Sequence, residues 1–340
     1  MAKLNGGNPP SRLPTMADVA KKVGVSRQLV SLVFRGGAGV NPETEVKIRT
    51  AAKEIGYRPN LAARSLRQDS SRYIGVVFHT SESSMDELLP ALYKHAKRAG
   101  YDLMLSAVTT QRGEAEAIEE IIGHRCEGMV LISPQSPKSR LQRLARELPM
   151  VSIGRRLTGV RCGVVSSWGE KGVAEAVAHL VSLGHREIAC VYAKDMNDGE
   201  FRLEGYLNGM HEAELRPDVV ELEGDFGELG GARAAEKLLR RKTLPTAVVC
   251  NNDQSAFGFI HRLQQAGVAF PSEMSVVGYD DTLARWPFLS LTTVRQDGDE
   301  LAAAAIFDLA SRIRGEKFIS ETVLTSSKLV LRTSTTAPIR

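Results

Sequence analysis

The first seventy residues constrain the fold of this chain most strongly, because they hold three short helical patterns separated by clear breakers. The breakers are residue types that start or stop helices, namely Thr15 with Asp18, Gly24, Ser26, Asn41 with Pro42, and Gly56. Thr and Asp at this spacing suit an N-terminal cap, Gly suits a left-handed stop, and Pro suits a first helical turn. The pattern predicts a helix-turn-helix followed by a supporting helix.

Basic charge is concentrated in the same stretch. Residues 1–72 hold 13 Lys and Arg against 5 Asp and Glu, and the whole chain holds 44 against 40, so the remaining residues hold 31 against 35. A basic surface on a small helical unit displaces counterions from a phosphate backbone. We therefore expect this segment to bind DNA, with a small basic domain that binds another ligand as the alternative.

Several motifs along the chain occur in an order that resembles one known family. They are TMADVA at 15–20, GVS at 24–26, VS at 30–31, GYRPN at 56–60, ARSLR at 63–67, IGVVF at 74–78, GHREI at 184–188 and GYDD at 278–281. Together they resemble the LacI/GalR family of bacterial transcription repressors over nearly the whole chain. The resemblance implies an effector-controlled, sequence-specific regulator that binds double-stranded operator DNA, and we expect it to act as a homodimer.

After residue 70, short apolar runs alternate with amphipathic stretches, first over 74–132 and again over about 168–279. Such alternation predicts parallel sheets covered by helices on both faces. The resemblance implies a periplasmic-binding-protein-like core whose chain crosses between two lobes near residues 167, 296 and 327. The expected fold class is a small all-α helix-turn-helix head plus an α/β core of two doubly wound parallel-sheet lobes.

The chain is accordingly divided into four segments, which are a flexible tail (1–14), a helix-turn-helix domain (15–59), a hinge helix or linker (60–70), and an effector-binding and dimerisation core (71–340). The first lobe is expected over about 71–167 and 297–327, and the second over about 168–296 and 328–340. The start of the chain has no apolar secretory stretch, and no run long enough to span a bilayer occurs. We expect a cytoplasmic protein without a membrane partner.

The start of the second helix is the expected DNA-reading position, because this part of the motif enters the major groove. Arg27 and Gln28 stand there and can pair with the edges of guanine and adenine, or merely contact phosphate. Leu32 departs from the polar reader that many family members carry, although it could contact a thymine methyl. The residues expected to contact the DNA backbone are Ser26, Ser31 and Arg35.

The hinge segment is too short to form a stable helix alone. By resemblance it folds when two copies pair over the minor groove, and Leu66 of each copy wedges between base steps. Asn60, Arg64 and Arg67 would contact the DNA beside it. The alternative for Leu66 is an exposed leucine in a linker.

The resemblance also implies an effector site between the lobes. Asp280 and Arg202 are expected to hold the ligand from opposite sides of a cleft, with Phe226 as an aromatic wall and Asn252 as a polar reader. This set favours a sugar or sugar derivative, whereas the alternative for Arg202 and Asp280 is a structural role in loops. Three departures from the family lie at Ser167 with Trp168, at Met196 or Glu200, and at Met85. Trp168 is expected to stack on a sugar or to lie in the core, and Met85 stands where an aromatic residue often lies.

Enzyme motifs are missing from the sequence. We find no nucleophile elbow, phosphate-binding loop, dinucleotide fingerprint or zinc-protease motif, and the four cysteines form no C-x-x-C pair. We therefore expect no catalytic residues, no metal ligands and no cofactor, with reduced, buried thiols. The alternative function is a sugar-binding or sugar-modifying enzyme module that carries a regulatory DNA-binding head.

Overall fold

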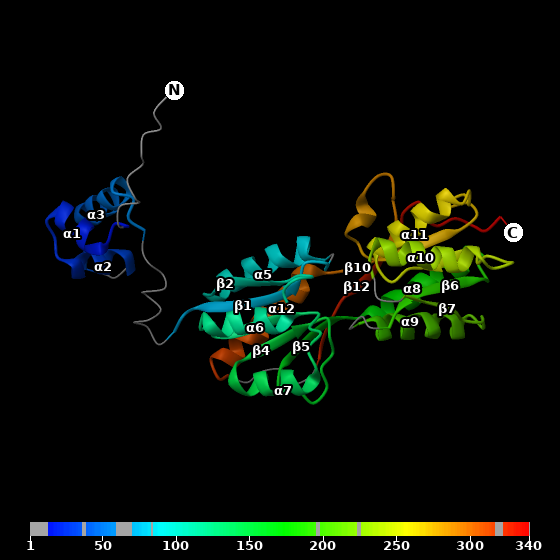
Figure 1. Cartoon of the computed structure of the whole chain (residues 1–340), viewed down its shortest axis with the longest axis horizontal. Helices are drawn as coiled ribbons and strands as arrows, with labels where there is room; N and C mark the ends of the chain where they lie inside the picture. Colours follow the sequence, from blue (N-terminus) through cyan, green and yellow to red (C-terminus); the bar gives the residue numbers. More distant parts are fainter. Residues whose placement is uncertain are drawn as a thin grey trace, which may run out of the picture. The chain divides into compact units, whose positions relative to one another are not determined.

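The computed structural model describes residues 13–35, 39–58, 70–82, 84–194, 198–222, 226–316 and 322–339. These residues form two compact units, a head that ends at Ser71 and a core that begins at Arg72. Each unit has its own hydrophobic core, and the two are described separately (Figure 1). Most of the expected tail and of the expected hinge lies outside the described residues.

The head consists of helices α1 (Met16–Val23), α2 (Arg27–Arg35) and α3 (Pro42–Glu54). The expected caps are present, because Asp18 accepts the backbone N–H of Thr15 at 2.7 Å and Asn41 accepts that of Glu43 at 2.9 Å. Gly24 ends α1 in the left-handed conformation, with φ of 76°. The inner faces share a small core of Val19, Ala20, Val30, Val33, Ile48, Ala52 and Tyr57. The predicted helix-turn-helix with its supporting helix is confirmed.

The core contains two six-stranded sheets, one in each lobe (Figure 1). Lobe 1 has the strand order β11-β5-β4-β3-β1-β2, and all its strands are parallel. Its strands are β1 (Tyr73–His79), β2 (Asp102–Val108), β3 (Gly128–Ile132), β4 (Met150–Ile153), β5 (Gly163–Ser167) and β11 (Val323–Thr325). Its helices are α5 (Met85–Ala99), α6 (Glu114–Gly123), α7 (Lys138–Glu147) and α12 (Gly298–Ile313). Apolar clusters lie on both faces of this sheet, as the alternation predicts.

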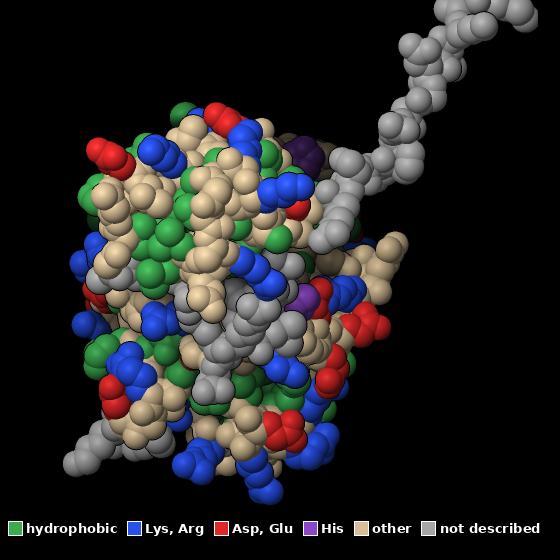
Figure 2. All heavy atoms as spheres, turned by 90° about the vertical axis from the view of Figure 1, so that its left-hand side faces the viewer, with side chains coloured by type: hydrophobic (Ala, Val, Ile, Leu, Met, Phe, Trp, Pro, Cys, Tyr) green, Lys and Arg blue, Asp and Glu red, His purple; other side chains and the backbone are tan. Residues whose placement is uncertain are grey.

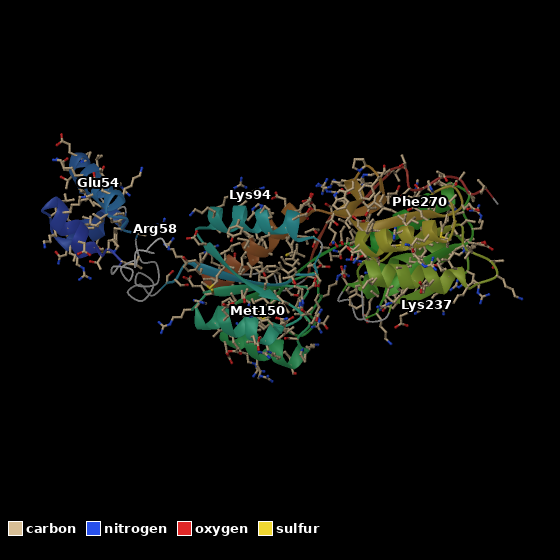
Figure 3. All side chains as sticks on the ribbon, turned by 45° about the horizontal axis from the view of Figure 1, so that its top comes forward. Glu54, Arg58, Lys94, Met150, Lys237 and Phe270 are labelled. Carbon is tan, nitrogen blue, oxygen red and sulfur yellow. The ribbon has the colours of Figure 1, made fainter. Side chains whose placement is uncertain are left out.

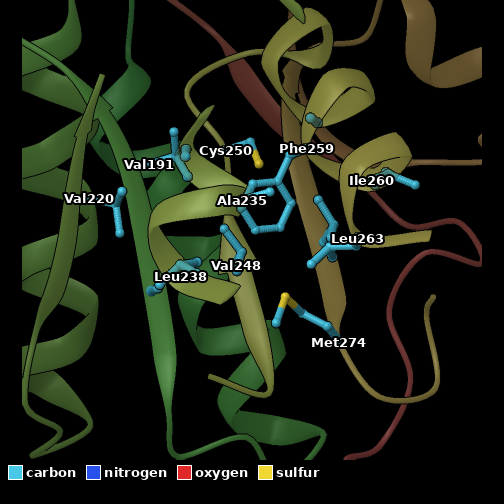
Figure 4. Close-up of a cluster of buried hydrophobic side chains, with 14 of the residues drawn as sticks. Val191, Val220, Ala235, Leu238, Val248, Cys250, Phe259, Ile260, Leu263 and Met274 are labelled. Atoms are coloured by element: carbon cyan, nitrogen blue, oxygen red, sulfur yellow. The ribbon is translucent and has the colours of Figure 1, made fainter. Parts of the chain in front are cut away.

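Lobe 2 has the order β12-β10-β9-β8-β6-β7. Its strands are β6 (Ile188–Ala193), β7 (Asp218–Leu222), β8 (Ala247–Val249), β9 (Ser275–Asp280), β10 (Thr292–Gln296) and β12 (Ser327–Val330). Its helices are α8 (Gly169–Ser182), α9 (Gly199–Glu212), α10 (Glu228–Leu239), α11 (Asp253–Gln265) and the 3-10 turn η1 (Leu283–Arg285). The largest apolar cluster of this lobe lies under α10 and α11, around Phe259 (Figure 4).

The second sheet departs from the expected parallel pattern at one edge, where β12 pairs with β10 in the antiparallel direction. The reason is the path of the chain. Strand β11 ends at Thr325 in lobe 1 and β12 begins at Ser327 in lobe 2. Strand β10 runs toward lobe 1, because the chain leaves lobe 2 at its end. Strand β12 begins at the same edge of lobe 2 and runs away from lobe 1, so the two strands are antiparallel.

Helices α10 and α11 pack unusually closely, and two glycines make this possible. A Cβ atom on Gly258 would lie 1.8 Å from the carbonyl oxygen of Glu228, and one on Gly231 would lie 1.9 Å from that of Ser255. The backbones therefore touch directly where larger residues would separate the helices. Among the described residues, no helix combines the length and apolar character needed to cross a membrane.

Candidate DNA-binding surface and effector site

The start of α2 presents the residues that the sequence indicates for DNA reading. Ser26 accepts the backbone N–H of Leu29 at 3.1 Å, so its side chain caps the helix. Arg27 and Gln28 follow in the first turn and are exposed, whereas Ser31 and Leu32 are half-buried. The first turn of α2 thus offers two hydrogen-bonding side chains to a partner. The opposite side of the helix packs Val30 and Val33 into the hydrophobic core of the head.

The basic residues of the head are not equally available. Arg49 donates to Glu45 at 2.8 Å and to the carbonyl oxygen of Val33 at 3.2 Å, so it ties α3 to α2. Lys22 pairs with Glu54 at 2.7 Å on the surface. On the face shown in Figure 2, Lys and Arg side chains are interspersed with Asp, Glu and apolar side chains. Arg49 and Lys22 are thus engaged in contacts within the head.

Four of the expected DNA contacts, Asn60, Arg64, Leu66 and Arg67, lie outside the described residues. Arg35 ends α2, and its side chain also lies outside the described atoms. The wedge assigned to Leu66 and the phosphate contacts assigned to these residues therefore remain predictions from the family resemblance.

Arg202 and Asp280 lie together in the core. The Arg202 Nη2 atom is 2.6 Å from Asp198 Oδ2 and 3.8 Å from Asp280 Oδ1, and its guanidinium stacks 3.7 Å from the centre of the Tyr279 ring. Its Nη1 donates to the carbonyl oxygen of Asn251. Burial lowers the pKa of Arg202, but Asp198 and Asp280 outweigh it and raise that pKa above its usual value. The guanidinium is a fixed, permanently charged group.

The expectation that Arg202 and Asp280 face each other from opposite sides of a cleft is wrong. Arg202 stands on α9 and Asp280 ends β9, and both elements belong to lobe 2. Asp280 has φ of 104°, a left-handed conformation that is costly for a non-glycine residue. Gln296, at the end of β10, donates to Asp280 Oδ1 at 2.6 Å and holds the carboxylate in place.

The facing group from lobe 1 is Glu82, which the sequence analysis missed. Burial, followed by the charges of Asp198 and Asp280, raises the pKa of Glu82 from 4.5 to about 7, while a hydrogen bond from Ser133 and the charge of Arg202 oppose the rise. The side chain is nevertheless partly exposed. Glu82 thus lies near charged groups of the protein and also contacts solvent, as a residue that lines a cleft does. Neither helical nor strand periodicity in the sequence marks such a residue.

A small cavity beside Asp280 lies between the lobes among the described residues. A cavity of about 20 Å³ is lined from lobe 1 by Ser84, Glu87, Leu88, Gly298 and Leu301, and from lobe 2 by Asp280, Thr282 and Gln296. That volume holds about one water molecule.

The other expected effector residues are placed as follows. Asn252 is buried and caps α11, because its Oδ1 accepts the backbone N–H of Ser255 at 2.7 Å, and its Nδ2 donates to the carbonyl oxygen of Phe226 at 3.1 Å. The Phe226 side chain packs partly against the apolar cluster around Phe259, and Met85 packs against that of lobe 1. Through these contacts, Asn252 and Phe226 hold the segment before α10 against the start of α11.

Trp168 directly follows Ser167, whose hydroxyl is 3.0 Å from the hydroxyl of Tyr279. The Trp168 side chain is 44% exposed, with Lys171 Nζ 5.2 Å from the ring centre. The ring lines an open groove of about 630 Å³ together with Leu324, Lys328 and neighbouring residues of β11 and β12. This exposure excludes the expected core position, whereas stacking of Trp168 on a sugar stays a prediction.

Comparisons with known proteins agree with this architecture. Residues 15–60 match the domain described as "Bacterial regulatory proteins, lacI family", and residues 177–335 match the periplasmic binding protein-like domain. The HTH-type transcriptional repressor PurR of Pasteurella multocida is 31% identical over 332 residues, which cover 95% of this chain and 98% of PurR. The HTH-type transcriptional regulator GalR of Salmonella typhimurium is 32% identical, with 96% and 97% covered.

A solved structure is similar over the same length. The lac repressor dimer bound to operator and the anti-inducer ONPF matches with a TM-score of 0.83 and 26% identity, covering 96% of this chain and 100% of the repressor chain. Fold and site together define a transcription regulator that has a helix-turn-helix head and a two-lobed core. The chain belongs to the lacI family of bacterial regulatory proteins.

Proposed function

We propose that this protein is a sequence-specific transcription repressor that binds a palindromic operator as a homodimer and responds to a small ligand bound between the lobes. The observation that carries the proposal is the first turn of α2, where Ser26 caps the helix and Arg27 and Gln28 are exposed. Both side chains have the donor geometry that reads bases in the major groove. A similar protein, the lac repressor, was solved as a dimer on its operator, which supports the same arrangement here.

The effector is a small polyhydroxylated molecule. Arg202 and Asp280 offer donors and an acceptor within 3.8 Å of each other, and Glu82 adds a second acceptor from lobe 1. Hydroxyl groups can both give and accept hydrogen bonds, so they satisfy such a set. The related regulator CelR, at 26% identity and a TM-score of 0.71, was solved with cellobiose, which supports a sugar.

The protein acts without turnover. The relatives at 31% and 32% identity are transcriptional regulators, and the residues around Arg202 pair with one another as fixed charges. A cytoplasmic location follows from operator binding. An enzyme module with a DNA-binding head would instead convert a sugar that stabilises it, so incubating each stabilising sugar with the protein and analysing the products separates these functions.

The operator is found by selecting duplexes from a random pool with the full chain and measuring affinity by fluorescence anisotropy. We expect one palindromic sequence to be enriched. Arg27→Ala should lose the preference for it, whereas Lys53→Ala, an exposed basic residue near the end of α3, should retain it. A pool without any enriched sequence, together with equal affinity for all duplexes, would contradict the proposed function.

The hinge prediction requires a separate measurement. If Leu66 wedges between base steps, Leu66→Ala should reduce DNA bending in a fluorescence-transfer assay on the selected operator. Arg64 and Arg67 would then contribute salt-dependent affinity to all duplexes. Unchanged bending would remove the wedge.

A further inference from the structure

Arg156 bridges the two lobes at the first crossing of the chain. It lies in the connection between β4 and β5 of lobe 1, and its Nη1 and Nη2 donate to the two carboxylate oxygens of Glu170, on α8 of lobe 2, at 2.9 and 2.8 Å. Its guanidinium also lies 3.6 Å from the centre of the Phe201 ring, on α9. A forked ion pair and a stacked aromatic ring are the geometries in which Arg cannot be replaced by another cation.

The Arg156 bridge, formed by Arg156, Glu170 and Phe201, is shielded from solvent. The side chains of Arg156 and Glu170 are 15% and 19% exposed. Arg156 Nη2 also donates to the carbonyl oxygen of Ser167 at 3.2 Å, which is the last residue of β5 before the chain enters lobe 2. The guanidinium therefore joins both sides of the crossing, and a change in the angle between the lobes must alter its contacts.

The close approach of α8 and α9 places the two lobe 2 partners side by side. A Cβ atom on Gly205 would lie 2.2 Å from the carbonyl oxygen of Glu170, so α9 touches the backbone of α8 at this point. Phe201, one turn before Gly205, is thereby brought beside Glu170. Phe201 is also the neighbour of Arg202 in the same helical turn, so the Arg156 bridge adjoins the proposed effector site.

We propose that Arg156 is a positioning residue that holds the lobes in this orientation, so that loosening the Arg156 bridge alters operator affinity even without effector. This inference rests on the proposed function for its link to DNA, although the Arg156 bridge itself does not. A ligand can shift only an equilibrium between states that it binds differently. Without the Arg156 bridge, the two lobes should also adopt an orientation relative to each other that differs from the one described here, even when no effector is present.

The distance between the lobes tests the Arg156 bridge directly. Spin labels are placed on Cys introduced at Arg98 of α5 and Arg233 of α10, both exposed, on helices of different lobes that also carry Lys94 and Lys237 (Figure 3). Burial raises the pKa of Cys126 and Cys162 to about 11 and that of Cys190 to about 12, so these native thiols stay unlabelled. Cys250 is also buried. Labelled chains are mixed with excess unlabelled chains, so that each pair reports one core.

We expect pulsed electron resonance to show one narrow distance population in the parent protein and an added longer one in Arg156→Met. The charge-reversed pair Arg156→Glu with Glu170→Arg should reduce that longer population. The matched control is Arg112→Met, because Arg112 pairs with Glu120 at 2.6 Å entirely within lobe 1. An unchanged distance distribution in Arg156→Met, or equal broadening in the control, would overturn the proposal that Arg156 holds the lobes in this orientation.

Operator affinity tests the link to regulation. Arg156→Met should change affinity for the selected operator at least tenfold without effector, and Arg112→Met should leave it within twofold. A changed distance with unchanged operator affinity would overturn control through the Arg156 bridge. If the parent chain selects no operator, the proposed function fails, while the distance measurement still decides whether Arg156 holds the lobes together.

Discussion

Glu82→Gln should make the core more stable at neutral and alkaline pH. Glu82 faces the carboxylates of Asp198 and Asp280, and burial with these charges raises its pKa from 4.5 to about 7. In the unfolded chain the group ionises near pH 4.5, so between pH 4.5 and 7 the folded protein binds more protons than the unfolded one. Stability from this group is therefore present below pH 4.5 and is lost as the pH rises through about 7.

The size of the effect follows from the shift. A rise from 4.5 to about 7 corresponds to about 3 kcal/mol if the whole shift is expressed in stability. Because the side chain is partly exposed, solvent screening lowers this to about 1–3 kcal/mol. Glutamine keeps a hydrogen-bonding group for Ser133 but cannot ionise. As the pH rises from 5 to 8, the free energy of unfolding of the variant should therefore increase by about this amount relative to that of the parent.

Urea unfolding at fixed protein concentration measures the difference. The only tryptophans of the sequence, Trp168 and Trp286, both lie in the unit that begins at Arg72, so their fluorescence reports the unfolding of that unit. Asp253, whose pKa burial and Asp280 also raise to about 7, contributes a slope of the same sign to both proteins and cancels in the difference. Glu147→Gln, at an exposed position that ends α7, serves as the control and should run parallel to the parent. Parallel pH profiles for Glu82→Gln and the parent would refute the reasoning.

Three further predictions concern the other parts of the molecule. Arg27→Ala should weaken binding to the selected operator by about 1–3 kcal/mol and barely affect random duplexes, as measured by anisotropy; equal losses on both would exclude base reading. Asp280→Asn should weaken a ligand found by thermal-shift screening by about 1.5–3 kcal/mol in calorimetry, and undiminished affinity would place the effector elsewhere. Gly258→Ala should destabilise the core by about 2–3 kcal/mol, because its Cβ would lie 1.8 Å from the Glu228 carbonyl oxygen. Gly123→Ala, which meets no atom within 4 Å, is its control, and similar urea midpoints for the two variants would contradict close packing of α10 and α11.

The head was predictable because its signals are local. Thr15 with Asp18, Gly24 and Asn41 act on backbone groups within three or four residues, so their spacing in the sequence already describes the contacts they make. The two-sheet architecture was predictable for a related reason. Strands buried on both faces are rich in apolar residues, and the fold class is confirmed.

The site was less predictable, because its groups come from distant parts of the chain. Glu82 belongs to the segment between β1 and α5, whereas its charged neighbours lie more than a hundred residues away, so no spacing connects them. Asn252 illustrates the converse. An Asn three residues before Ser255 is a local capping pattern, and reading that pattern would have assigned its side chain to the start of α11.

The first turn of α9 explains why the proposed effector site and the lobe orientation should be coupled. Asp198 pairs with Arg202 at 2.6 Å, and the intervening Phe201 stacks on Arg156 of lobe 1. Residues in one helical turn share a backbone and move together, because the hydrogen bonds of the turn resist independent shifts. A ligand that competes with Asp198 or Asp280 for the Arg202 guanidinium therefore acts on the same turn that Arg156 holds. By linkage, an effector that binds one lobe orientation more tightly shifts the lobe equilibrium, so a variant that changes this equilibrium also changes the apparent effector affinity. Arg156→Met should thus alter both the lobe distances and the calorimetric affinity, and a change in only one of them would separate the two sites.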